Sequence, residues 1–155
     1  MQRGSDLHAI FALSVASSAG RCPPPSVPMD YRGYHQSMLS WIDTFKPDPV
    51  LIEVASIASG RYPFAGTPDL LAWIQYRGRR VLAVVDLKSG QPMRWHATQV
   101  LAYSKLQHHQ GATTRGLLYL HADGSAPTYQ TPKTNPHDWA AFHAALNLLI
   151  WRESL

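Results

Sequence analysis

Three charged residues in the middle of the chain lie where the surrounding sequence is strand-like and apolar. Asp69 lies in the segment Phe-Ala-Gly-Thr-Pro-Asp-Leu-Leu, and Asp86 and Lys88 lie in Val-Leu-Ala-Val-Val-Asp-Leu-Lys. Ionised side chains in a protein core are costly unless they are paired or bound to a metal. Their positions therefore indicate chemistry as well as packing.

The spacing of these residues about a predicted hairpin turn brings them together. Asp69 lies 8 residues before Arg77, and Asp86 lies 8 residues after Gly78. If the flanking strands pair antiparallel about this turn, the two carboxylates become near neighbours across the ladder. Lys88 points to the same face as Asp86, because side chains alternate along a strand. One face of the predicted sheet thus presents two acids and a lysine.

Two carboxylates this close repel each other unless a cation lies between them, and hard divalent ions with oxygen ligands are the natural occupants. A lysine beside such an ion can orient a water molecule and stabilise the hydroxide that develops from it. The residues by themselves also fit a purely structural ion pair between Lys88 and one of the acids, Asp86 or Asp69. Both interpretations stay open at this point.

Four more polar residues accompany this set in the sequence. Glu53 interrupts an apolar stretch before the predicted hairpin, and His8 offers an imidazole on a predicted first helix. Gln99 and Tyr103, at positions i and i+4, make one polar face of a helix that follows the hairpin. Each of these residues is common in a structural role, but their joint occurrence in this order favours a shared site.

The elements that must position these residues follow from hydrophobic periodicity and from the Pro and Gly breaks. We expect helices around His8 with Ser5 as N-cap, after Asp30 as N-cap, over 94–109 and from Pro136 onward. We expect strands over 50–57, 64–76, 80–87, 115–121 and 128–131, with a loop over 20–30 and turns at 59–60, 77–78 and 123–124. This order predicts an α/β domain with a mixed sheet between helices.

Length and composition exclude several classes of protein. The 155 residues correspond to one domain, and 45% apolar with 15% charged residues excludes a disordered chain. The single cysteine, Cys22, excludes a disulfide framework, a four-cysteine zinc site and an iron–sulfur cluster held by one chain. Any metal must therefore bind oxygen and nitrogen ligands. A net charge of +4 permits a polyanionic partner without requiring one.

The N-terminal segment allows two interpretations. An apolar run over 9–16 followed by small residues at 17–19 resembles a secretory signal, whereas Asp6 and His8 fit an ordinary helix. No stretch approaches the roughly 18 uninterrupted apolar residues of a membrane-spanning helix. We therefore expect a soluble, cytoplasmic protein that keeps this segment and makes no membrane contact.

Taken together, these motifs resemble the PD-(D/E)xK nuclease superfamily. Within it they are similar to the RecB-like exonuclease domains of phage, bacterial recombination, CRISPR-associated and mitochondrial genome-maintenance proteins. Pro68-Asp69 with Asp86-Leu87-Lys88 matches the motif that names the superfamily. Gln99 with Tyr103 matches its QxxxY motif, the segment over 3–8 resembles its opening helix, and Glu53 falls on its first-strand acid. The resemblance covers roughly residues 3–121.

The resemblance implies a restriction-endonuclease-like core within a single domain over 1–155. This core is a mixed β-sheet flanked by helices, of order αβββαβ, with extra N-terminal and C-terminal helices. The hairpin and helix over 122–155 are then additions that the family tolerates.

The resemblance also implies a role for each matching residue. The implied ligands of Mg²⁺ or Mn²⁺ are His8, Asp69, Asp86, the Leu87 carbonyl and, for a second ion or a bound water, Glu53. An imidazole ligand favours Mn²⁺. Lys88 then positions the attacking water, and Gln99 and Tyr103 hold Lys88, a phosphate or the strand. The metal serves as Lewis acid in an in-line displacement that leaves a 5′-phosphate and a 3′-hydroxyl.

DNA, single-stranded or with free ends, is the implied partner, with a recombination protein as a possible second one. Basic residues near the motifs in sequence suit phosphate binding: Arg77, Arg79, Arg80, Arg94, Lys105 and Arg115. Trp95, His96 and Tyr103 suit stacking on unpaired bases. Each of these residues equally fits a solvated charge or a buried aromatic side chain.

The leading hypothesis is a metal-dependent deoxyribonuclease that degrades single-stranded or frayed DNA ends as an exonuclease. One alternative is a catalytically silent nucleic-acid-binding or recombination module, against which the complete set of Asp69, Asp86 and Lys88 argues. The other is a structure-specific or sequence-specific endonuclease of the same fold, for which the chain has little room to build a specificity domain.

Overall fold

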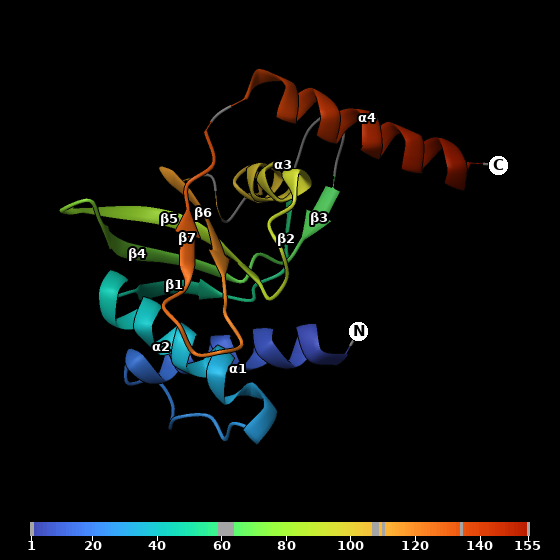
Figure 1. Ribbon diagram of the computed structural model, residues 1–155. Coiled ribbons are helices and arrows are strands. Elements are labelled where there is room, and N and C mark those ends of the chain that lie inside the picture. Colours follow the sequence, from blue (N-terminus) through green and yellow to red (C-terminus); the bar gives the residue numbers. More distant parts are fainter. Residues whose placement is uncertain (1, 59–63, 107–108, 110, 134, 155) are drawn as a thin grey trace.

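A five-stranded mixed sheet forms the centre of the computed structural model, which describes residues 2–58, 64–106, 109, 111–133 and 135–154 (Figure 1). In spatial order its strands are β1 (Asp48–Ile52), β4 (Leu70–Tyr76), β5 (Arg79–Lys88), β6 (Thr114–Tyr119) and β7 (Thr128–Gln130). The β5–β6 pair is parallel, and the other neighbouring pairs are antiparallel. A separate two-stranded sheet consists of β2 (Ser56–Ala58) and β3 (Phe64–Gly66).

Helices cover both faces of the central sheet (Figure 1). On one face lie α1 (Gln2–Ser18) and α2 (Arg32–Phe45), the latter preceded by the short 3₁₀ helix η1 (Met29–Tyr31). On the other face lies α3 (Arg94–Tyr103), which provides the crossover that a parallel pair such as β5–β6 requires. The predicted α/β class, with a mixed sheet flanked by helices, is therefore confirmed.

The core lies on both sides of β5, whose residues from Ala83 to Leu87 are all buried. Leu87 packs with α1 and α2 in a cluster that includes Phe11 and Trp41. Val84 packs under α3 with Val100 in a second cluster. A strand covered on both faces needs nearly continuous apolar sequence, which is why the interrupting charges of β5 are informative.

The helix predicted after Asp30 is confirmed as α2, in which Tyr34, Met38, Trp41 and Ile42 are buried. Both predicted N-caps are wrong. The first helix, α1, already begins at Gln2, where the packing of Leu7 and its neighbours stabilises it. Ser5 therefore lies inside the helix. Asp30 belongs to η1, and α2 starts after Tyr31 instead.

Two predicted strands are each divided between the two sheets. The strand predicted over 50–57 breaks at Glu53, which has a left-handed backbone with φ of +49°, and its parts are β1 and β2. The strand predicted over 64–76 breaks before Asp69 into β3 and β4, because Pro68 has no N–H to donate to a ladder. The predicted turn at 59–60 lies outside the described residues.

The predicted hairpin turn is confirmed. Arg77 and Gly78 have φ of +51° and +74°, as a two-residue type I′ turn between strands requires. β6 and β7 form the predicted strand and return strand. The third predicted helix is too long, because α3 ends at Tyr103 and Ser104 to Leu106 form turns.

The C-terminal helix α4 (Pro136–Glu153) starts at the predicted proline, and the Asn135 side chain accepts a hydrogen bond from the His137 N–H. It lies beyond α3 and extends past the sheet (Figure 1). None of its described residues is buried, and Leu148 and Trp151 are largely exposed. No described helix, α4 included, is both long and apolar enough to cross a membrane.

Candidate functional site

The two predicted acids meet where β4 begins and β5 ends. Leu70 pairs with Val85, so the residues next to them, Asp69 and Asp86, face each other across the ladder. Both side chains are buried, and the Leu87 N–H donates a hydrogen bond of 2.6 Å to Asp69 Oδ2. The predicted neighbourhood of the two carboxylates is confirmed.

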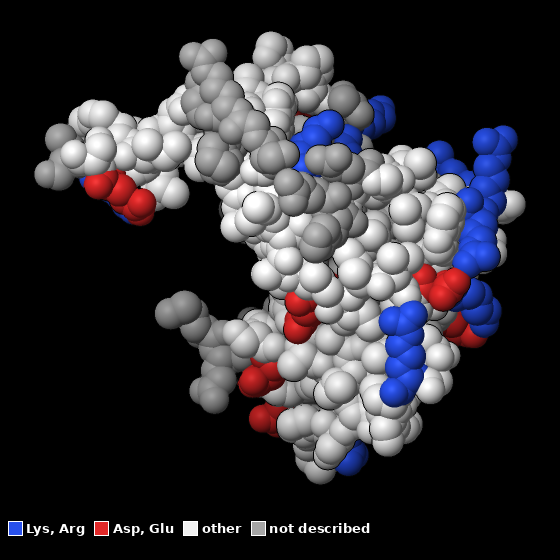
Figure 2. Space-filling view, turned by 180° about the vertical axis from the view of Figure 1, so that it is seen from behind, with Lys and Arg blue, Asp and Glu red and all other residues white. Residues whose placement is uncertain are grey.

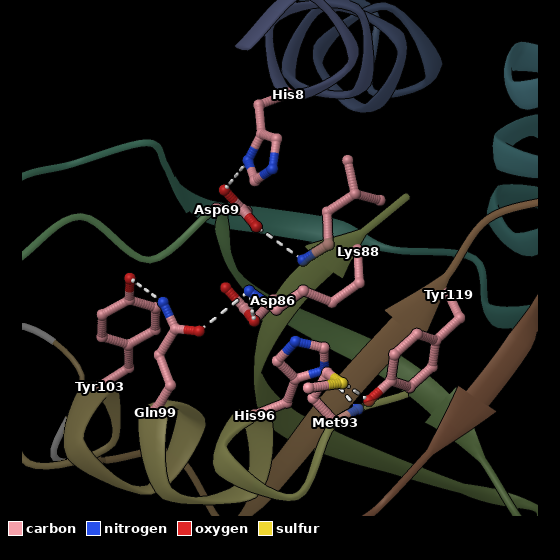
Figure 3. A network of polar contacts seen from close by, with 10 residues as sticks. His8, Asp69, Asp86, Lys88, Met93, His96, Gln99, Tyr103 and Tyr119 are labelled. Atoms are coloured by element: carbon pink, nitrogen blue, oxygen red, sulfur yellow. Dashed lines mark hydrogen bonds and ion pairs between the residues drawn. The ribbon is translucent and has the colours of Figure 1, made fainter. Parts of the chain in front are cut away.

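Lys88 joins this pair to α3 (Figure 3). Its Nζ lies 2.7 Å from Asp86 Oδ2 and donates a hydrogen bond of 2.9 Å to Gln99 Oε1. Gln99 Nε2 in turn donates a hydrogen bond of 2.9 Å to the Tyr103 hydroxyl. The structure thus brings the predicted lysine, glutamine and tyrosine into one chain of contacts, while the Lys88–Asp86 ion pair also fits the purely structural interpretation.

Side chains alternate between the two faces of β5, and this alternation explains why Asp86 and Lys88 lie together on the side of Gln99. Leu87 packs into the core against α1 and α2, so Asp86 and Lys88 turn to the side of α3. The backbone alternates as well: the Lys88 carbonyl accepts from Leu120 beyond β6, whereas the Leu87 N–H bonds to Asp69 beside β4. The Leu87 carbonyl therefore faces the edge where Asp69 lies.

His8 and Glu53 complete the polar cluster from two further elements. His8 Nδ1, on α1, lies 2.5 Å from Asp69 Oδ1. Glu53 directly follows β1, and its N–H donates a hydrogen bond of 3.0 Å to the Asp69 carbonyl. One possible ligand atom each from His8, Glu53 and Asp69 lies within 4.8 Å of the others. The strand position predicted for Glu53 is wrong, because the left-handed residue ends β1, yet the carboxylate still lies at the site.

The electrostatics of the site follow from burial and from the two neighbouring carboxylates. Burial first, and then the Asp69 charge, raise the pKa of Asp86 from 3.8 to about 6, although Lys88 opposes the shift. The hydrogen bond to Asp69 raises the pKa of His8, against the effect of burial. The surroundings of Asp86 therefore compensate its negative charge only in part.

The donor set fits a hard divalent cation. Asp86 Oδ2 is buried and accepts no well-formed hydrogen bond from a described residue, in spite of the nearby Lys88 ammonium. Carboxylate oxygens with one imidazole suit Mg²⁺ or Mn²⁺. A cation here would replace the direct contact between His8 and Asp69 and would offset the repulsion between Asp69 and Asp86.

Several predicted phosphate-binding residues lie away from this site. Arg77, Arg79 and Arg80 lie at the turn of the β4–β5 hairpin, whereas Asp69 and Asp86 lie at its other end. Arg80 pairs with Asp48 at 2.5 Å. In Figure 2 many Lys and Arg side chains lie along one edge, where some acidic side chains accompany them, and other acidic side chains lie on the opposite, hollowed side. These three arginines are therefore near the motifs in sequence but lie at the far end of the hairpin from the two acids.

His96 has a structural position instead of the predicted stacking position. It is buried, its Nδ1 accepts a hydrogen bond from the Met93 N–H, and the same atom lies 3.0 Å from the Tyr119 hydroxyl. These contacts fix the start of α3, and burial lowers the pKa of His96. His96 is the third residue of α3, the position at which capping-box side chains bond back to the N-cap residue. This position was the feature of the sequence that could have predicted its structural role.

Trp95 is exposed, as stacking on a base requires, and its ring centroid lies 5.5 Å from Lys88 Nζ. This cation–π contact had no signature in the spacing of the motifs.

No protein-family model matches the chain, and no curated protein sequence matches it. The chemistry of the site is therefore inferred from its residues and their geometry.

Proposed function

We propose that this chain is a metal-dependent nuclease of the PD-(D/E)xK type, which hydrolyses phosphodiester bonds at single-stranded or frayed DNA ends as an exonuclease. The observation that carries the proposal is the arrangement at one end of β4 and β5, where Asp69 faces Asp86 and Lys88 contacts both Asp86 and Gln99. The order α1, β1, β4, β5, α3 and β6 supports a restriction-endonuclease-like core.

Three clustered side chains, His8, Glu53 and Asp69, would hold Mg²⁺ or Mn²⁺. Asp86, which faces Asp69 across the ladder, would be the fourth ligand, with the Leu87 carbonyl on the same edge. When bound, the ion supplies Lewis acidity and neutralises charge on the scissile phosphate. The two buried carboxylates that face each other support this assignment, because the Lys88 ammonium compensates their mutual repulsion only in part.

Lys88 is the residue that positions the attacking water. Its ammonium orients a water molecule in line with the bond to be broken and stabilises the negative charge that develops on it. Gln99 Oε1 restrains the ammonium by accepting a hydrogen bond from it. Tyr103 accepts from the other end of the same amide and so keeps Oε1 turned toward Lys88.

Cleavage of end-labelled DNA tests the proposal. Labelled single-stranded and duplex oligonucleotides and a covalently closed circle are incubated with Mg²⁺, Mn²⁺ or EDTA, using wild type, Lys88→Ala and Lys46→Ala. Lys46 is an exposed lysine paired with Asp43 and serves as the matched control. We expect ion-dependent loss of the linear strands and an intact circle, with a rate at least about 100-fold lower in Lys88→Ala.

Three outcomes would contradict this proposal in different ways. Equal rates for wild type and Lys88→Ala would remove Lys88 from the chemistry. Cutting of the circle would assign the endonuclease alternative. Binding of DNA without cleavage under either ion would assign the silent binding module.

A further inference from the structure

A groove of about 700 Å³ lies between α3 and α4, beside the candidate metal site. Gln99 and Tyr103 form part of its wall from α3, Phe64 contributes from β3 and Phe142 from α4. Its lining is mostly apolar and contains no charged side chain among the described residues. The volume lies in the range of ligand pockets, and the residues that orient Lys88 also border the groove.

Two features keep this groove open. At its start, α4 is held against β3 by aromatic contacts, in which Phe142 and Trp139 lie 4.7 Å and 6.3 Å from Phe64, measured between ring centroids. Further along, α4 lines the groove with Ala141 and Ala145, one turn apart. Their short side chains leave the space between the two helices unfilled.

Trp95 marks the boundary between the groove and the candidate metal site. It lines the groove, its side chain is 54% exposed, and its ring lies near Lys88 Nζ. A strand whose phosphate lies at Lys88 therefore has its neighbouring base within reach of this indole.

We propose that the groove binds unpaired nucleobases of the strand held at the metal site, with Trp95, Phe64 and Phe142 as stacking surfaces. The inference rests on the proposed function, because it takes the groove's occupant to be the DNA strand. An uncharged lining that includes aromatic rings matches the flat faces of neutral bases and disfavours phosphates, which stay at the charged site. A paired end must fray before its bases can enter.

Binding of base-containing and abasic strands tests the groove. Fluorescence anisotropy is measured with a labelled 12-nucleotide deoxythymidine strand and with an abasic strand of equal length, with Ca²⁺ in place of Mg²⁺. We expect wild type to bind the thymidine strand at least about tenfold more tightly, since stacking on an aromatic side chain contributes to each bound base. Trp95→Ala removes a stacking surface and Ala145→Phe fills the groove, so each variant should lose most of this preference.

Trp73→Ala is the matched control, because Trp73 is an exposed tryptophan of β4 that contacts Arg80 away from the groove. Both groove substitutions replace exposed residues, so their thermal unfolding should match that of wild type. Equal affinity for the two strands, or an unchanged preference in both variants, overturns the inference. A dimer that Ala145→Phe converts to a monomer, with unchanged preference, also overturns it and assigns the groove to a second copy.

The groove and the nuclease activity can fail separately. A base-dependent affinity without cleavage in Mg²⁺ or Mn²⁺ supports the groove and refutes the nuclease. Cleavage with base-independent affinity supports the nuclease and refutes the groove.

Discussion

Asp86 is the side chain on which the candidate site depends most, because its burial opposes the charge that a metal ligand needs. The site compensates it in part with Lys88, while Asp69 across the ladder adds repulsion. Functional sites commonly keep such unfavourable charges, and the stability they cost is recovered when the ligand binds. Without a cation, the residue should therefore destabilise the fold near neutral pH.

Asp86→Asn is expected to gain stability relative to wild type as the pH rises. Asp86 has a pKa of about 6 in the folded protein and 3.8 ordinarily, so between these values the folded state binds more protons than the unfolded state. The stability of wild type therefore falls from about pH 4 to pH 6, and the loss is complete above that range. The asparagine variant lacks this loss and should gain about 2–3 kcal/mol relative to wild type between pH 4 and 8.

Urea unfolding in EDTA at pH 4, 6 and 8 measures this difference. Asp43→Asn, which changes an exposed aspartate, controls for the change in net charge. A difference between Asp86→Asn and wild type that stays constant with pH would contradict the assigned pKa.

At the scale of elements, the β4–β5 hairpin was predictable and its flanks were not. A two-residue turn with glycine fixes the register, so counting outward from Arg77-Gly78 placed Asp69 opposite Asp86. The break at Glu53 gave no comparable signal. The carboxylate interrupts the apolar stretch, but a left-handed backbone is uncommon in residues other than glycine, so the residue type did not predict it. The division into β1 and β2 therefore became visible only in the structure.

The end of α3 and the groove beside α4 could not be predicted from the sequence either. Helix-compatible residues continue past Tyr103, but the chain turns there to reach β6. The apolar residues of α4 predict a helix without specifying which neighbour they face, and none of them is buried. The Trp95–Lys88 contact likewise depends on how α3 packs above β5.

Gly33 holds α2 against the loop between β6 and β7, and Gly33→Ala should destabilise the protein. A Cβ atom at this position would lie 1.8 Å from the Ala122 carbonyl oxygen, so the backbone would have to move. We expect a loss of about 1–3 kcal/mol in the free energy of unfolding, typical of overpacking. Gly4→Ala is the matched control: Gly4 lies in α1 with nothing within 4 Å, so alanine should stabilise by about 0.5–1 kcal/mol.

Chemical denaturation of the two alanine variants measures both effects. A Gly33→Ala variant as stable as Gly4→Ala would show that α2 can move away from the β6–β7 loop without a loss in the free energy of unfolding.

At the scale of the whole molecule, the candidate cluster ties α1 to the sheet through His8 and Asp69. A cation bound there should raise the melting temperature, since it binds the folded state only. At a concentration about 100 times its dissociation constant, the gain is about 2.7 kcal/mol, or roughly 5–10 °C for a protein of this size. His8→Ala should lose most of this increase, which differential scanning fluorimetry with Mn²⁺ and with EDTA would measure.

His121→Ala is the control for that experiment, because His121 lies after β6 and bonds to Thr128 outside the cluster. An equal temperature increase in wild type and His8→Ala would place the cation elsewhere or remove His8 from its ligands.

The contacts of the site span very different lengths of chain. Lys88 and Gln99 are 11 residues apart, whereas His8 and Asp69 are separated by 61 residues. During synthesis the histidine leaves the ribosome long before its partner, and contacts between distant residues form slowly because a long loop must close first. We therefore expect the cluster to be among the last parts of the molecule to assemble. A chain interrupted before β4 and β5 have paired carries His8 on a helix but has no carboxylate pair for it to join.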